Sequence, residues 1–170
     1  ARGAGVGGEG HIESLVYEAY TPGGTALIIE CLTDNRNRTA SDVKHMLTKN
    51  GGSFASSGAV TYLFDRLGVI HIPESLPMSR HDEIELALID AGALDILEED
   101  SSTEIRGGTH DLFKLSDAVT SLGLKADVIE FQWIPKILVE TDEVTGTAVA
   151  ELIETLEEHD DVSRVWSNLA

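Results

Sequence analysis

Basic residues are concentrated in one short stretch of an otherwise acidic sequence. Four of the six Lys and Arg residues in the first 70 positions fall between 36 and 49. With the histidine among them, the candidate side chains are Arg36, Arg38, Lys44, His45 and Lys49. A helix beginning after Thr39 would carry the last three around one side, and the two arginines would lie in the loop that leads in. The cluster favours contact with phosphate groups or an acidic partner, but an ordinary solvated helix face would show the same pattern.

Two glycine turns flank this stretch. Residues 20–24 read Tyr-Thr-Pro-Gly-Gly, and residues 49–53 read Lys-Asn-Gly-Gly-Ser. Glycine tolerates positive φ and leaves backbone N–H groups exposed. The turns could therefore admit RNA or another chain close to the backbone, and they could equally be ordinary turns.

Enzymatic chemistry has no support in the sequence. No phosphate-binding loop, dinucleotide-binding motif, zinc-protease motif or nucleophile elbow is present. None of the six histidines has partners whose spacing singles out a metal site. Cys31 lies in an apolar run and is expected to be a buried, inert thiol. Glu98, Glu99 and Asp100 are expected to be solvated acids at a hairpin turn. We therefore predict no catalytic residues, no metal and no cofactor.

Alternating secondary-structure patterns predict an α+β fold. In residues 69–134 the expected order is strand 69–72, helix 82–91, strand 94–98, strand 103–106, helix 110–122 and strand 126–134. The flanking sequence predicts the same β-α-β-β-α-β order: strand 25–33, helix 40–50, strand 59–64, strand 137–140, helix 146–158 and strand 162–166. A further strand is expected near 11–20. The prediction is two ferredoxin-like modules with antiparallel sheets, one inserted in the other.

The predicted domain boundaries follow from this order. Residues 11–68 and 135–170 form the split domain, and residues 69–134 form the inserted domain. Residues 1–10 contain five glycines and no Met, which is typical of a linker remnant and indicates that a segment preceded it.

Charge is distributed unevenly over these parts. The sequence has 12 Lys plus Arg and 30 Asp plus Glu, a formal net charge of −18. Residues 1–70 carry six basic and seven acidic residues, residues 71–134 four and fourteen, and residues 135–170 two and nine. This composition argues against a generally basic nucleic-acid-binding surface, so any polyanion would have to bind locally. No apolar run is long enough to span a bilayer, and the one cysteine fits a reducing compartment such as the cytoplasm.

Several distinctive motifs occur along the chain. The two longest are Tyr17-Glu-Ala-Tyr-Thr-Pro-Gly-Gly24 and Glu30-Cys-Leu-Thr-Asp-Asn-Arg-Asn-Arg-Thr39. Others are Val43-Lys-His45, Lys49-Asn-Gly-Gly52, Leu63-Phe-Asp-Arg-Leu-Gly-Val69 and Trp133-Ile-Pro135. These motifs resemble those of the YebC/PmpR family, which includes mitochondrial translational activators of cytochrome oxidase subunit one. The resemblance covers essentially the whole chain.

The resemblance implies the second and third domains of a three-domain protein whose basic N-terminal domain is missing here. It implies a regulator of gene expression, described in the family both as a DNA-binding transcriptional regulator and as a ribosome-associated translation factor. The residues that match these motifs and the basic stretch form the expected contact surface: Tyr20, Gly23, Gly24, Asn35, Arg36, Asn37, Arg38, Lys44, His45, Lys49, Gly51 and Gly52.

Three functions remain open from the sequence. The favoured one is a non-enzymatic factor that binds the ribosome or structured RNA in the cytoplasm, or in the mitochondrial matrix of a eukaryote. The second is a transcriptional regulator that binds DNA mainly through the missing N-terminal domain. The third is a ligand-sensing module built from paired ferredoxin-like domains. No membrane partner is expected.

Overall fold

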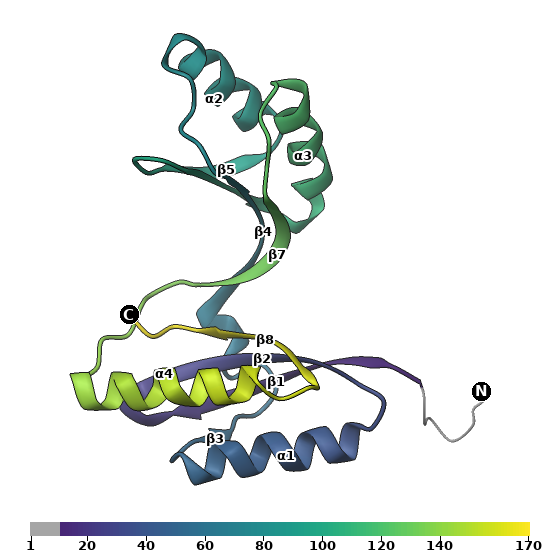
Figure 1. Ribbon diagram of the computed structural model, residues 1–170, viewed down its shortest axis with the longest axis vertical. Helices are drawn as coiled ribbons and strands as arrows, with labels where there is room; N and C mark the ends of the chain where they lie inside the picture. The colour runs from purple at the N-terminus through teal and green to yellow at the C-terminus, as the bar shows by residue number, and fades with distance from the viewer. Residues whose placement is uncertain (1–10) are drawn as a thin grey trace. The chain divides into compact units, whose positions relative to one another are not determined.

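The computed structural model describes residues 11–170, and the predicted linker 1–10 lies outside them (Figure 1). The chain divides into two compact units. Unit 1 contains the described residues up to Asp65 together with Ile134–Ala170, and unit 2 is Arg66–Trp133. The predicted boundaries lie within three residues of these positions.

Unit 1 is a four-stranded antiparallel sheet with two helices on one face. The strand order is β3-β1-β2-β8. The strands are β1 (Glu13–Thr21), β2 (Thr25–Thr33), β3 (Ser53–Phe54) and β8 (Val162–Ser167), and the helices are α1 (Arg36–Lys49) and α4 (Glu143–Glu157). A short 3-10 turn, Pro22–Gly24, joins β1 to β2, and their register pairs Glu13 with Thr33 and Thr21 with Thr25.

Alternation along the strands places the core of unit 1 between sheet and helices. Ala19, Leu27 and Ile29 are fully buried on the face toward α1 and α4. Val43 and Leu47 reach this core from α1, and Leu152 and Leu156 reach it from α4. The i, i+4 spacing on each helix supplies the apolar stripe that packs on the sheet. The outward face of each helix is left to solvent.

Two predicted strands of unit 1 are wrong. Residues 59–63 form turns and a 3-10 helix, Thr61–Leu63, and Phe64 already belongs to the following strand. Residues 137–140 make one isolated bridge, Val139 with Leu169. β1 takes a full place in the sheet instead, so unit 1 does not follow the predicted element order. The α+β class with antiparallel sheets is confirmed.

The Glu18 carboxylate explains why residues 59–63 form a loop and not a strand. Glu18 accepts hydrogen bonds from the backbone N–H groups of Gly58, Val60 and Thr61 at 2.8–2.9 Å. Its neighbour Ala19 belongs to the core beneath the helices, so Glu18 lies on the opposite face of the sheet. Burial would raise the pKa of Glu18, but the three amide donors outweigh it and lower that pKa. The loop is thereby held across this face, where Val60 is fully buried.

Unit 2 has the predicted β-α-β-β-α-β order. Its elements are β4 (Phe64–Ile72), α2 (His81–Asp90), β5 (Ala93–Glu98), β6 (Thr103–Gly108), α3 (Leu112–Ser121) and β7 (Val128–Pro135). The strand order β5-β6-β4-β7 is that of a ferredoxin-like sheet. α2 and α3 cover one face and bury Ile84, Leu88 and Leu115 against Ile70 and Ile105. No helix among residues 11–170 is long and apolar enough to cross a membrane.

Candidate functional site

The helix α1 carries the basic stretch and begins earlier than predicted. Asn35 is its N-cap and accepts the backbone N–H of Arg38 at 3.1 Å, so the predicted helix start after Thr39 is wrong. Thr39 is instead buried inside the helix. Arg36 and Arg38 consequently lie in the first turn of α1 and not in a loop. Asn is a stronger N-cap residue than Thr, which explains why the helix begins after Asn35 and not after Thr39.

Three polar side chains of α1 point into solvent. Lys44, His45 and Lys49 are exposed, opposite the buried residues Val43 and Leu47. In residues 11–170 none of the three forms an ion pair with a carboxylate. The charges of Lys44 and Lys49 are therefore available to an external anion. Asn37 is exposed on the same helix.

The two arginines differ in what they already bind. Arg36 lies 3.5 Å from the Glu13 carboxylate in a solvent-exposed pair, which contributes little stability. Arg38 donates to both carboxylate oxygens of Asp161 at 3.0 Å and also contacts Asp34. The predicted role of Arg38 as a phosphate contact therefore competes with a structural one.

Asp161 ties α1 to the turn before β8. Its side chain is 11% exposed, and it accepts the Thr39 hydroxyl at 2.8 Å in addition to Arg38. Burial would raise the pKa of Asp161, but the hydrogen bonds from Thr39 and Arg38 lower it below its usual value. The carboxylate is thus held ionised between two elements distant in sequence.

The two glycine turns lie side by side. β1 and β3 pair Tyr20 with Ser53, which brings residues 20–24 next to the end of α1. A Cβ on Gly52 would come within 2.9 Å of the Tyr20 carbonyl oxygen, and one on Gly51 within 3.3 Å of Pro22. Gly51 also has φ +80°, a conformation that favours glycine. Segments predicted separately from sequence therefore form one surface.

Gly23 and Gly24 have different surroundings within this surface. A Cβ on Gly23 would lie 2.7 Å from Thr141 and 2.9 Å from Thr145, so Gly23 allows close packing of the turn against the start of α4. Among the residues that the structure describes, nothing lies within 4 Å of a Cβ on Gly24, which faces open space. Tyr20 is 44% exposed, and its hydroxyl donates to the Ala59 carbonyl at 3.4 Å. Both glycines are exposed, but of the two only Gly24 has open space where a side chain would be.

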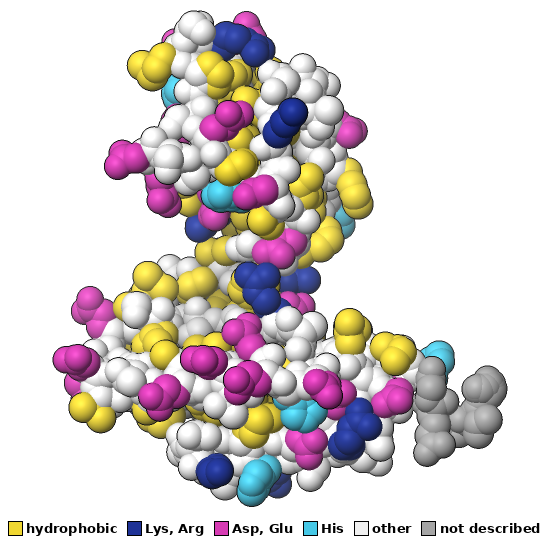
Figure 2. Space-filling view, in the orientation of Figure 1, with side chains coloured by type: hydrophobic (Ala, Val, Ile, Leu, Met, Phe, Trp, Pro, Cys, Tyr) yellow, Lys and Arg dark blue, Asp and Glu magenta, His cyan; other side chains and the backbone are white. Residues whose placement is uncertain are grey.

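We name the accessible part of this region the α1 surface. It consists of Tyr20, Gly24, Arg36, Lys44, His45, Lys49 and Gly51. α1 carries four Lys or Arg residues and one Asp, whereas the adjacent helix α4 carries four Glu and no Lys or Arg. Figure 2 shows the acidic side chains over α4 and the Lys, Arg and His side chains along α1 beneath it. The helix layer of unit 1 therefore has a basic helix, α1, beside an acidic helix, α4.

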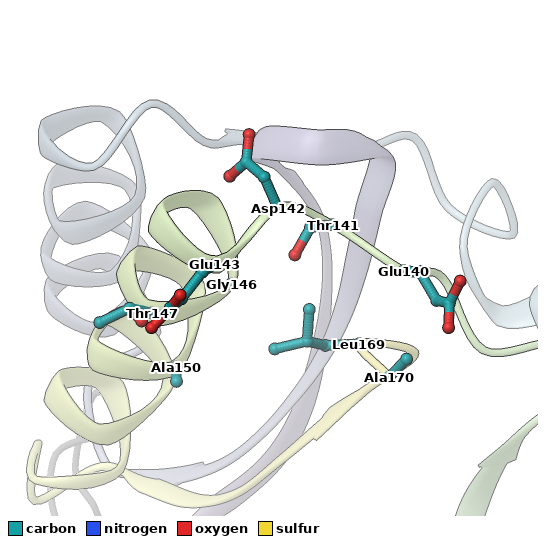
Figure 3. A pocket seen from close by; sticks show the side chains of 9 residues that line it. All are labelled: Glu140, Thr141, Asp142, Glu143, Gly146, Thr147, Ala150, Leu169 and Ala170. Carbon is teal, nitrogen blue, oxygen red and sulfur yellow. The ribbon is translucent and has the colours of Figure 1, made fainter.

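A broad depression at the start of α4 belongs to the acidic side. Its volume is about 670 Å³, and its lining includes Glu140, Asp142 and Glu143 (Figure 3). Asp142 is the N-cap of α4 and accepts the Thr145 backbone N–H at 2.7 Å, which lowers the pKa of Asp142. In Figure 3 the Glu140 and Asp142 carboxylates point away from each other. They do not converge on a reacting group or an ion.

Sequence reasoning missed a cavity of about 430 Å³ beside Gly24. It is lined by Gly24, Tyr62, Leu63, Lys136, Ile137, Val139 and Asn168. Tyr62 is 66% exposed, and Asn168 is held in place by accepting the Ala26 backbone N–H at 2.8 Å. The lining comes from four separate segments, so no local pattern could have indicated it. The cavity adds an aromatic ring and a Lys next to the β1–β2 turn.

The thiol of Cys31 is buried, as expected. Burial raises the pKa of Cys31 to about 11, so almost no thiolate is present at neutral pH. The group lies in the core between β2 and the helices.

The comparisons with known proteins agree on one family. A family model described as the second and third domain of TACO1/YebC matches residues 12–169. A "probable transcriptional regulatory protein" of Acidothermus cellulolyticus is 42% identical over 168 residues, which are 98% of this chain and 67% of that protein. The "probable transcriptional regulatory protein YebC" of Shigella flexneri is 40% identical over 99% of this chain and 67% of its own length. The crystal structure of a conserved hypothetical protein from Aquifex aeolicus matches with a TM-score of 0.82 and 35% identity, over 98% of this chain and 68% of that one. The chain thus spans about two thirds of the length of these relatives.

Proposed function

The chain belongs to the TACO1/YebC family, and on this basis we propose that it is a non-enzymatic regulator of gene expression that binds structured RNA of the translation machinery through the α1 surface. The observation that carries the proposal is the group Lys44, His45 and Lys49, which is exposed, has no carboxylate partner among residues 11–170, and lies beside two adjoining glycine turns. Because the relatives are bacterial, the protein would act in the cytoplasm.

The net charge of −18 restricts where such binding can occur but does not prevent it. At about 0.1 M salt, charges more than roughly 10 Å apart in solvent are largely screened from each other. Phosphates at the α1 surface would thus interact mainly with the cations of α1. Contacts to phosphates position a nucleic acid without reading its bases, so recognition by the shape of a folded RNA is the expected mode.

The glycine turns and the cavity beside Gly24 would contribute to recognition of the shape of a folded RNA. Gly24 faces open space and leaves the backbone accessible. Tyr62 offers an exposed ring on which an unpaired base could stack, and Lys136 offers a charge for the adjoining phosphate. Both features belong to unit 1, the unit that contains α1.

The test compares two double charge reversals in the 170-residue chain. Lys44→Glu with Lys49→Glu changes the α1 surface, and Lys114→Glu with Lys125→Glu makes the same charge change at exposed positions of unit 2. Co-sedimentation with bacterial ribosomes would be measured over a range of salt, beside an RNA hairpin and duplex DNA. We expect the first variant to lose RNA and ribosome binding and to lower the slope of log affinity against log salt by about two, one per phosphate contact. Equal binding by both variants would contradict the proposal.

A second candidate is the transcriptional regulation named in the relatives. It would place DNA contacts chiefly in the third of the relatives that this chain does not span. Sequence-selective duplex binding without ribosome association, measured with a full-length relative in the same assay, would favour this candidate.

A further inference from the structure

Unit 2 contains a group of metal-ligating side chains that the function proposed above does not use. His81 begins α2, Glu85 follows four residues later on the same helix, and Glu98 ends β5. One nitrogen or oxygen atom from each residue lies within 4.8 Å of the others. No other group of three such side chains is found in residues 11–170. The His81–Glu85 spacing alone does not indicate a metal site, because the third side chain, Glu98, lies 17 residues away from His81.

The imidazole of His81 lies between carboxylates. Its Nε2 is 2.8 and 2.9 Å from the two oxygens of Glu98, and its Nδ1 is 4.0 Å from Glu85 and 3.8 Å from Asp82. In the described residues, no Lys or Arg forms an ion pair with Glu85 or Glu98; the nearby Arg80 is paired with Glu83. The hydrogen bond that Glu98 accepts from His81 raises the pKa of His81. One imidazole thus faces three negative charges, an excess that an added cation would relieve.

We propose that His81, Glu85 and Glu98 bind a divalent transition-metal ion of the zinc type. Imidazole nitrogen and carboxylate oxygen are both zinc ligands, and a site with three protein ligands keeps a fourth position for water. The side chains of His81, Glu85 and Glu98 are 27%, 43% and 37% exposed, so an ion and its water can enter. A surface depression of about 430 Å³, lined by residues 78–83, opens beside His81.

Binding exchanges a proton for the metal. A proton on Nε2 of His81 would leave to solvent, the metal would take its place on that nitrogen, and the Glu98 carboxylate would turn to the metal. Tetrahedral zinc holds its ligand atoms about 3.4 Å apart. Glu98, now 2.8 Å from Nε2, must move outward by roughly 0.6 Å, and ligand atoms at the 4.8 Å limit must approach by up to about 1.4 Å. Partly exposed Glu side chains make such movements by rotation. The ion would then join the start of α2 to the β5–β6 hairpin.

The test measures zinc binding by the metal-free 170-residue chain, with Mg²⁺ as a comparison ion. His81→Gln and Glu98→Gln remove ligands, and His71→Gln is the matched control because His71 pairs with a lone carboxylate, Asp127, at 2.6 Å in the same unit. We expect one saturable zinc site, weaker Mg²⁺ binding, at least about tenfold loss of zinc affinity in the two ligand variants, and unchanged affinity in the control. Equal zinc affinity in all four proteins, or no saturable binding at micromolar zinc, would overturn the proposal.

A measurement on the unaltered chain makes the test independent of variant folding. Zinc should shift the side-chain ¹⁵N resonances of His81 and leave those of His71 in place. Zinc-induced shifts confined to other histidines would also overturn the proposal.

Discussion

Replacing Asp161 with Asn should destabilise unit 1 by about 2 kcal/mol at neutral pH. The carboxylate is nearly buried and accepts hydrogen bonds from Arg38 and from Thr39. A hydrogen bond to a charged group contributes about 1.5–3 kcal/mol. Arg38 is 45% exposed and keeps Asp34, and the Thr39 hydroxyl can still donate to the Asn35 carbonyl, so the lower half of that range applies.

The pH dependence identifies the cause. The folded-state pKa of Asp161 is lowered relative to the unfolded value of about 3.9, so its stabilising contribution is complete above that value and disappears as the pH falls through the folded pKa. Urea unfolding, followed by NMR signals of unit 1, would measure the difference between Asp161→Asn and the unaltered chain at neutral and at acid pH. The exposed neighbour provides the control, Asp160→Asn.

Two results would refute this reasoning. A loss equal at both pH values would mean that packing, and not charge, accounts for the effect. A loss no larger than that of Asp160→Asn at neutral pH would mean that Arg38 is not held by Asp161, and that its guanidinium is as available to RNA as the side chain of Lys44.

Two further perturbations test the units separately. Gly107→Ala should lower the free energy of unfolding of unit 2 by about 1–3 kcal/mol in urea, because the added Cβ would overlap a Leu115 methyl group. The control, Gly108→Ala, should lower it less, because the nearest atom to its Cβ lies at 3.5 Å. Equal losses of unfolding free energy would contradict the packing argument. Glu18→Gln should speed amide exchange at the three N–H groups that Glu18 accepts by about tenfold, with no change at amides of unit 2. Because the pKa of Glu18 is lowered on folding, the unaltered chain should lose this protection as the pH falls through that pKa; protection independent of both the substitution and pH would show that Glu18 does not hold the loop.

Local patterns were sufficient for much of the fold. The apolar run 25–33 predicted β2 with its bounds, and the order of elements in unit 2 followed from alternating periodicities. The pattern failed at 59–63, where the buried apolar residue Val60 belongs to a loop. The determining contact there is Glu18, about 40 residues away in sequence, and no local propensity encodes it.

The candidate site was predictable in composition but not in pairing. The basic residues and the glycine turns were identified from sequence, and their adjacency was not, because it depends on the pairing of β1 with β3. The partner of Arg38 lies 123 residues further along the chain. Sequence shows which side chains are charged, and only the fold shows which charges are already neutralised.

The boundaries between the units have an implication for how such a chain can be built. Unit 2 leaves and re-enters unit 1 through β4 and β7, which are neighbours in one sheet, and the Lys136 backbone N–H donates to the Leu63 carbonyl at 2.9 Å. The two junctions are therefore a single hydrogen bond apart. Exchanging the whole insertion for a short turn, or for a different domain, would change the closure entropy of unit 1 only slightly. Unit 2 can therefore be exchanged, or altered in charge, with little effect on the closure of unit 1.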